Sequence, residues 1–123
     1  TGAKTLGPMA EKDNFPFPCD DWLSEGDQPV SGLSVFALEG SKTQGELAFL
    51  LENSTLITGD LIRAHEGGKL CMLPDAKLKD RQAAVASVKR MASLENIRAV
   101  LPGDGWPIFS QGKEALNQLA ASI

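Results

Sequence analysis

Histidine and cysteine are scarce in this chain of 123 residues: His65 is its one histidine, and Cys19 and Cys71 are its two cysteines. A zinc site needs three or four thiolate or imidazole ligands that converge, and this inventory can hardly supply them. The two cysteines lie far apart and form no CxxC motif, so we expect free thiols in a reducing compartment. His65 stands in the polar, glycine-rich stretch 63–69, which predicts an exposed turn.

Long apolar runs and clusters of basic residues are also missing. The run Leu47–Leu51 is far too short to span a bilayer, and no basic-then-apolar segment indicates a signal peptide. Lysine and arginine are mixed with acidic residues and the net charge is −4, which argues against nucleic acid as a partner. With 42% hydrophobic and 23% charged residues, the composition is that of a globular protein. We expect one cytoplasmic domain over residues 1–123, with neither a membrane nor nucleic acid as partner.

The periodicity of the apolar residues predicts a layered fold. Short apolar runs indicate strands over 3–6, 33–38, 47–51, 55–58 and 98–101. The gap between the third and fourth of these is of hairpin length, so this part of the sheet is expected to be antiparallel. Apolar residues recur at three- and four-residue steps from Asp80 to Leu94, which predicts an amphipathic helix, and a second helix is expected over 113–122. This order favours an α/β (α+β) sandwich with a mixed sheet and two C-terminal helices.

Two of the predicted strands stop at Gly followed by Asp, within the runs Leu56–Asp60 and Val100–Gly105. Each therefore places a carboxylate, Asp60 or Asp104, on the loop just past a strand, where α/β folds carry their chemistry. A Gly-Asp turn whose Asp caps a backbone amide would explain either residue singly. It explains the matched spacings of the whole set poorly.

Taken together, these segments resemble the C-terminal half of a metallo-β-lactamase-fold protein. The matching features are Thr58-Gly59-Asp60 after a strand, Leu73-Pro74-Asp75, a helix opening at Asp80, and the run from Ala99 to Ile108. They cover nearly the whole chain. The resemblance implies half of an αβ/βα sandwich, in which the family holds two metal ions at one edge of its sheets. Family members usually hydrolyse esters, thioesters, amides or phosphodiesters with a metal-bound hydroxide.

The metal-ligand positions that this resemblance identifies are degenerate. The family's first motif, His-x-His-x-Asp-His, belongs to the N-terminal half and would precede the first residue. In the Gly-His-Thr-Pro-Gly loop, aligned through Thr43 and Gly45, Lys42 takes the place of the histidine. The bridging aspartate is retained as Asp60, whereas the last histidine is replaced by Asp104.

Lysine at a ligand position points away from a metal centre. At neutral pH it has three donors and no acceptor, so it cannot ligate a metal, and its charge repels one. We therefore hypothesise that Lys42 stands where a metal stood and pairs with Asp60 and Asp104, with no cofactor bound. A competing hypothesis keeps a cation: Asp60, Asp104 and Glu46 supply only oxygen, which suits Mg²⁺, Mn²⁺ or Ca²⁺ better than zinc. In that case Asp60 and Asp104 are the first ligands.

Two further residues are candidates for the rim of a cleft. Thr43 follows Lys42 directly, and Trp106 follows Asp104 closely. Buried packing is the more common role of a tryptophan and is the expectation for Trp106 and for Trp22. The sequence identifies no small-molecule ligand.

Two functions stay open. The first is a non-catalytic descendant of the fold that serves as a binding or structural module. The second is a metal-dependent hydrolase, with Zn or Mg/Mn, whose missing ligands come from an N-terminal half or a second chain. Half a sandwich exposes one face of its sheet, with apolar residues such as Val35 or Leu50 on it. We expect a second copy in a two-fold dimer, or a separate N-terminal half, to cover that face.

Overall fold

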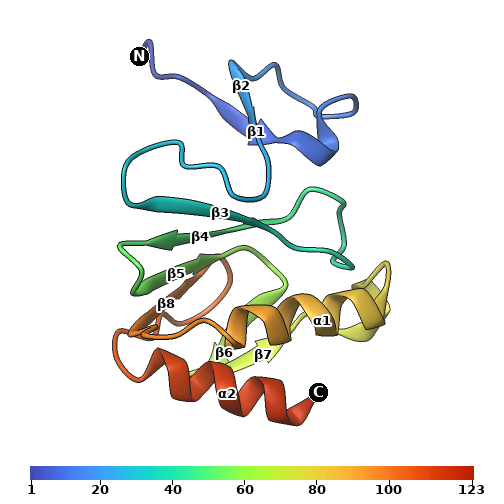
Figure 1. Ribbon diagram of the computed structural model, residues 1–123. Helices are drawn as coiled ribbons and strands as arrows, with labels where there is room; N and C mark the ends of the chain where they lie inside the picture. Colours follow the sequence, from blue (N-terminus) through green and yellow to red (C-terminus); the bar gives the residue numbers. More distant parts are fainter.

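The computed structural model describes residues 1–123 as a sheet with two helices along one face (Figure 1). The main sheet has four strands in the order β3 (Leu33–Ala37), β4 (Leu47–Leu51), β5 (Thr55–Thr58) and β8 (Ala99–Pro102). The pairs β3–β4 and β4–β5 are antiparallel, and β5–β8 is parallel. The mixed sheet predicted from the sequence is therefore confirmed, including its antiparallel hairpin.

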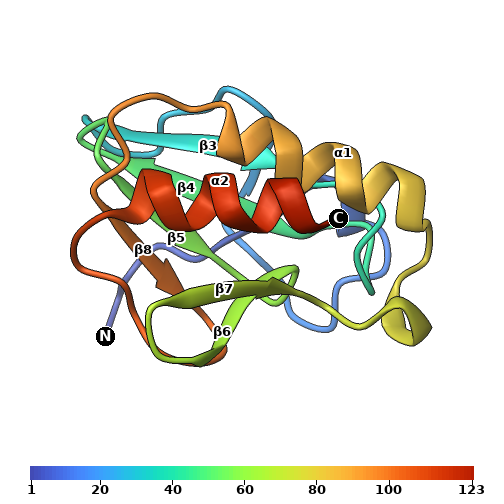
Figure 2. The same ribbon diagram turned by 90° about the horizontal axis from the view of Figure 1, so that it is seen from below.

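Two helices, α1 (Arg81–Ala92) and α2 (Gly112–Ser122), pack beside each other below the sheet (Figure 2). Asp80 is the N-cap of α1, and its carboxylate accepts a hydrogen bond of 3.1 Å from the backbone N–H of Ala83. Neither helix is long and apolar enough to cross a membrane. The predicted periodicity places the buried side chains well: Ala84, Val88, Met91 and Ala92 in α1, and Ala115, Leu116 and Leu119 in α2.

Two small sheets flank the main one. β1 (Leu6–Pro8) runs parallel to β2 (Asp21–Leu23), and β6 (Ile62–Glu66) runs antiparallel to β7 (Lys69–Met72). Single 3₁₀ turns, η1 and η2, span 9–11 and 75–77.

The first strand begins later than the sequence predicted. Residues 3–5 are not in a strand, and β1 starts at Leu6. The carboxylate of Asp20 accepts hydrogen bonds from both the backbone N–H (2.7 Å) and the hydroxyl (3.1 Å) of Thr5, so a side chain satisfies this backbone in place of a neighbouring strand. These bonds hold the pKa of Asp20 below its ordinary value.

The segment around His65 is a hairpin and not the turn that was expected. Arg63, Ala64 and His65 lie within β6, and only Gly67 and Gly68 form the turn before β7. A Gly-Gly pair between two strands is a common two-residue hairpin connection. The strand β6 was missed in the sequence because it is largely polar: Ile62 and Ala64 are buried, and the residues between and after them are polar.

Both edges of the main sheet are closed by irregular segments. Along β3, the Val35 N–H donates to the carbonyl oxygen of Asp27, and the Val35 carbonyl accepts from the Gly26 N–H, both at 2.9 Å. Along β8, Val100 and Ile108 exchange two backbone hydrogen bonds of 2.8 Å. A strand from another molecule cannot pair with the sheet at these points, because the backbone groups already have partners.

The two faces of the main sheet differ in what covers them. The helix face carries buried core residues, namely Ala48, Leu50, Leu56 and Val100. Side chains alternate along a strand and paired residues share a face. The strand register therefore places six apolar residues on the opposite, open face, namely Leu33, Val35, Phe49, Leu51, Ile57 and Leu101, together with the polar Thr55 of β5.

The expectation that Val35 or Leu50 is exposed on the open face is wrong. Leu50 belongs to the helix-side core, and Val35 is on the open face but only 1% exposed. Val35 and the buried Leu23 lie outside the helix-side core, and β1 and β2 lie next to β3 in Figure 1. The N-terminal segment therefore covers the β3 end of the open face. Farther along the sheet Leu51 is exposed, and Phe49 is half-buried.

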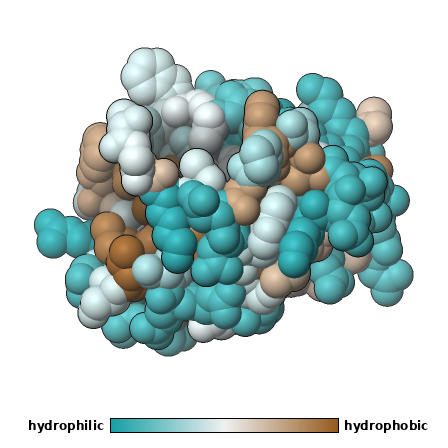
Figure 3. Space-filling model, turned by 90° about the horizontal axis from the view of Figure 1, so that it is seen from above, coloured by the Kyte–Doolittle hydropathy of each residue, from teal (hydrophilic) through white to brown (hydrophobic).

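Phe109 follows the residue that pairs with β8. Ile108 pairs with Val100 and is buried with it, so strand-like alternation would direct Phe109 towards the open face, beside Ala99. Phe109 is 71% exposed. Other exposed apolar side chains are scattered, and Figure 3 shows hydrophobic patches separated by hydrophilic residues on the upper surface.

Loss of the N-cap of α1 gives a first test of the fold. We expect Asp80→Ala to lower the free energy of unfolding by about 1 kcal/mol, because the Ala83 N–H loses its acceptor. Urea unfolding followed by circular dichroism measures the change. Asp13→Ala, at an exposed position outside any helix or strand, is the control and should stay within about 0.5 kcal/mol of the parent. Equal stabilities of the two variants would contradict the assignment.

Candidate functional site

The carboxyl ends of β3, β5 and β8 lie at one end of the sheet, because these three strands run in the same direction. The loop after β3 carries Lys42, the loop after β5 carries Asp60, and the loop after β8 carries Asp104. The Gly103 N–H donates to the carbonyl oxygen of Thr58 at 2.8 Å, so the last two loops leave the sheet side by side. The structure thus brings the sequence-predicted residues to one end of the sheet.

Lys42 forms an ion pair with Asp60, through Nζ and Oδ2. The side chain of Lys42 is 49% exposed and that of Asp60 32%. The hydrogen bond from Lys42 holds the pKa of Asp60 below its ordinary value; the charges of Arg63 and Lys77 act in the same direction, and partial burial opposes them. A pair this exposed contributes at most about 1 kcal/mol to stability.

Glu46 does not contact the ion pair directly but bonds to the residue next to each of its two members. Its Oε2 accepts a hydrogen bond from the hydroxyl of Ser41, and its Oε1 accepts one of 2.6 Å from the backbone N–H of Leu61. Ser41 directly precedes Lys42 and Leu61 directly follows Asp60. Both carboxylate oxygens therefore already accept a hydrogen bond from within the protein, and a metal ion at Glu46 would have to compete with these two donors.

Arg63, which the sequence reasoning missed, is the partner of Asp104. Its Nη2 contacts Oδ2 of Asp104, and His65 Nε2 lies 3.1 Å from the same oxygen. The Arg63 side chain is only 11% exposed, and its Nε has no hydrogen-bond partner. Lys42 therefore pairs with Asp60 alone. The Gly67-Gly68 hairpin signal could have placed Arg63 and His65, two residues apart, on the same face of one strand.

The loop that carries Asp104 is tied to β6. The Asp104 carbonyl accepts from the Ala64 N–H at 3.0 Å, and the Trp106 N–H donates to the Ala64 carbonyl at 2.7 Å. Gly105 lies between them at φ +112°, and a Cβ atom there would come within 1.9 Å of the Ala64 oxygen. Only glycine fits this close approach. The acidic loop and the basic strand are thus held together by the backbone as well as by side chains.

The expectation of buried packing for Trp106 is wrong, because its side chain is 64% exposed. Only its backbone is tied to the core, through the bond to the buried Ala64. Trp22, by contrast, is half-buried and packs edge-to-face against Phe15 at 5.6 Å.

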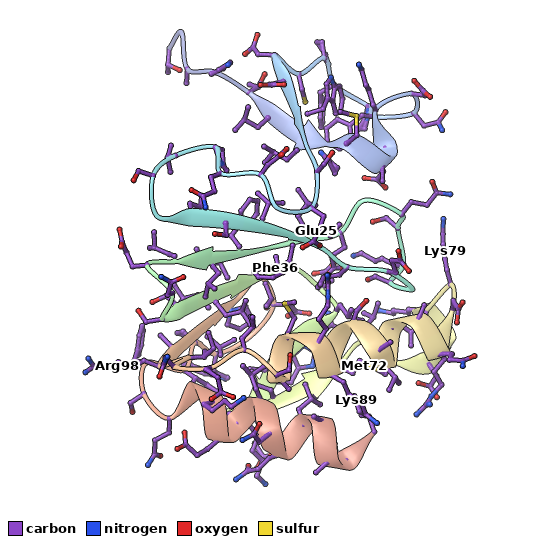
Figure 4. All side chains as sticks on the ribbon, in the orientation of Figure 1. Glu25, Phe36, Met72, Lys79, Lys89 and Arg98 are labelled. Atoms are coloured by element: carbon purple, nitrogen blue, oxygen red, sulfur yellow. The ribbon has the colours of Figure 1, made fainter.

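Thr43 faces a different part of the molecule from the ion pair. It lines a cavity of about 320 Å³ between the loop after β3 and the start of α1. Lys79, which extends from the start of α1 in Figure 4, lines the same cavity. None of the molecule's cavities is lined by the four paired residues Lys42, Asp60, Arg63 and Asp104.

The donor set does not fit a two-metal centre. No group of three or more His, Cys, Asp or Glu side chains converges in a way that could hold a metal ion. Each of the two strand-end carboxylates instead contacts a basic side chain of the same chain. Neither an ammonium nor a guanidinium offers a lone pair to a metal.

Comparisons with known proteins agree on the family. A sequence profile described as "Metallo-beta-lactamase superfamily" matches residues 1–123. No protein of the curated set matches the chain.

Solved structures of metallo-β-lactamases share the fold. The DIM-1 metallo-β-lactamase superposes with a TM-score of 0.72 at 18% identity, over 97% of this chain and 58% of its own. An enzyme from Pontibacter korlensis gives 0.72 at 16% identity, over 98% and 57%. TTHA1623, solved in a di-iron-bound form, gives 0.61 at 31% identity, over 81% and 47%. The chain thus spans about half the length of these proteins, from 47% to 58%.

The ion pair at Asp60 predicts a pH-dependent stability difference. Because the folded-state pKa of Asp60 is lowered, the pair contributes above the unfolded-state value of about 3.9 and is lost as the pH falls through the folded-state value. We expect Lys42→Ala to lower the free energy of unfolding by up to about 1 kcal/mol at pH 7, and by progressively less as the pH falls below the ordinary carboxyl value. Urea unfolding at a series of pH values from 7 downwards measures this difference. Identical unfolding curves at pH 7 would show that the pair contributes nothing.

Proposed function

The chain belongs to the metallo-β-lactamase superfamily, and we propose that within it the chain serves as a non-catalytic binding or structural module whose metal site has been lost. One observation carries the proposal: both carboxylates at the carboxyl ends of β5 and β8 are held by cations of the chain itself. Lys42 contacts Asp60, and Arg63 contacts Asp104. The two basic groups neutralise the carboxylates without any bound ion.

The chemistry of the two cations supports this assignment. A divalent ion at Asp60 would have to displace the Lys42 ammonium, and one at Asp104 would have to displace a guanidinium that is almost fully buried. Removing one member of a buried pair leaves an uncompensated charge, which is strongly destabilising. Of the two exchanges, the one at Asp104 is therefore the more unfavourable.

The alternative is a metal-dependent hydrolase that is completed by a further polypeptide segment. Two observations favour it: TTHA1623, 31% identical to this chain, is described in a di-iron-bound form, and the Lys42–Asp60 pair is exposed enough to open. In this reading, an N-terminal half or a second chain supplies the missing ligands of a Zn or Mg/Mn site. Its substrate would be an ester, thioester or phosphodiester.

We also propose that another polypeptide covers the open face of the sheet. The strand residues on this face are apolar apart from Thr55, and none of them is charged, so burying them desolvates no ion. Strand-like alternation would add Phe109, which is 71% exposed. A second copy of the chain or a separate N-terminal half are the two occupants to be distinguished. A cytoplasmic location belongs to the same proposal, and the two free cysteines, Cys19 and Cys71, support it.

Metal content tests the lost-site proposal. We expect protein purified without chelator to hold far less than one equivalent of zinc, manganese or iron by inductively coupled plasma mass spectrometry. Calorimetric titration with Zn²⁺, Mn²⁺ and Mg²⁺ should show no saturable heat, because Asp60 and Asp104 are engaged. Near-stoichiometric metal, or a saturable isotherm abolished by Asp60→Asn, would overturn the proposal in favour of the hydrolase.

The solution mass tests the covered face. We expect light scattering after size exclusion to give more than the 13.1 kDa of one chain, about twice that value for a two-fold pair. Phe109→Ser should weaken the association, because strand-like alternation would direct its exposed ring towards the open face. Phe17→Ser, at a phenylalanine of similar exposure outside this face, should not. A stable folded monomer would leave the separate half as the remaining occupant; if that half also failed to bind on mixing, the proposal would be wrong.

A further inference from the structure

We propose that Glu46 is the positioning residue that holds Lys42 against Asp60. The inference rests on the proposed function, because it concerns a site in which Lys42, and not a metal, stands at Asp60. Its starting point is a half-buried carboxylate whose two oxygens accept hydrogen bonds from two different loops.

The ion pair alone cannot fix its own geometry. Both members are substantially exposed, and an exposed Lys–Asp pair gains little free energy against the entropy of a long, flexible lysine side chain. The cavity beside the loop after β3 leaves that segment with space on one side. Some other contact must therefore hold the loop backbones in register.

Glu46 supplies that contact through the residues adjacent to the pair. The Ser41 hydroxyl, which is 0% exposed, donates to one carboxylate oxygen, and the Leu61 N–H donates to the other. Hydrogen bonds to an ionised carboxylate are stronger than those between neutral groups. Because Lys42 and Asp60 are the next residues along each loop, one carboxylate sets the distance between them.

The surrounding backbone is shaped around this carboxylate. The Glu46 carbonyl accepts from the Leu38 N–H at 2.9 Å, which closes the base of the loop that carries Lys42. A Cβ atom at Gly59 would come within 3.1 Å of Glu46 Oε1. Glycine at that position therefore lets the loop with Asp60 approach the carboxylate closely.

Glu46→Leu tests the proposal on the metal-free protein. A leucine side chain of similar size accepts no hydrogen bond, so the connections to Ser41 and to Leu61 are both lost, whereas a glutamine amide could accept from the Leu61 N–H and donate to the Ser41 hydroxyl. We expect the reactivity of Lys42 towards an acetylating reagent to rise by up to about fivefold, the factor that a contact of about 1 kcal/mol represents. Peptide mass spectrometry measures the rate at each lysine, with Lys69 as the internal reference. The carboxyl pKa of Asp60, followed by carbon-13 NMR, should rise towards its ordinary value as Lys42 leaves.

Two further variants keep the test decisive. Glu39→Leu removes an exposed carboxylate from the same loop and should change neither readout. Ser41→Ala breaks one of the two connections and should move both readouts in the same direction as Glu46→Leu. Ser41→Ala therefore provides the test if Glu46→Leu fails to fold. Unchanged Lys42 reactivity and unchanged Asp60 titration in either folded variant would overturn the positioning role. Stoichiometric metal in the purified protein would instead overturn the proposed function, so the two failures are distinguishable.

Discussion

The parallel pairing of β5 with β8 is the constraint on which the site depends. Parallel neighbours need a long crossover, and here it contains the β6–β7 hairpin and α1. The crossover returns the chain so that Asp60 and Asp104 leave the sheet at the same end. It also delivers β6 to the side of the loop after β8, where Ala64 bonds to both Asp104 and Trp106. The same pairing thus gathers two carboxylates and brings Arg63 to one of them.

Two carboxylates gathered in this way need compensation, and the chain supplies it in two different forms. At Asp60 the cation is an exposed lysine on a loop, which can leave at little free-energy cost. At Asp104 the cation is the nearly buried guanidinium of Arg63. Its strand is joined to the loop with Asp104 by the two backbone hydrogen bonds of Ala64. The two ion pairs therefore differ in how easily they separate: the pair at Asp60 can open while the pair at Asp104 stays formed.

Local patterns in the sequence were sufficient for the elements with strong periodicity or a clear stop. The helix after Asp80, the hairpin β4–β5 and the strand ends at Asp60 and Asp104 follow from apolar spacing, capping and Gly-Asp turns. The Gly67-Gly68 signal could have placed Arg63 on a strand, but no local pattern could have placed it beside Asp104, because the two residues are 41 positions apart in the sequence. The backbone bond between Trp106 and Ala64 likewise joins residues that are far apart in the sequence, and no local pattern encodes it. Non-local contacts, and not propensities, decided these positions.

The closed edges of the main sheet determine how copies of this molecule can associate. The outward-facing backbone groups of Val35 bond to Gly26 and Asp27, and those of Val100 bond to Ile108. Edge-to-edge addition of strands from another molecule is therefore blocked at both edges of the main sheet. The open face of the main sheet stays available for association, and one partner that covers this face leaves no room for a second. Self-association of this chain should therefore saturate at a finite particle and not run on into a fibre, even at concentrations where an exposed apolar surface would otherwise be a hazard.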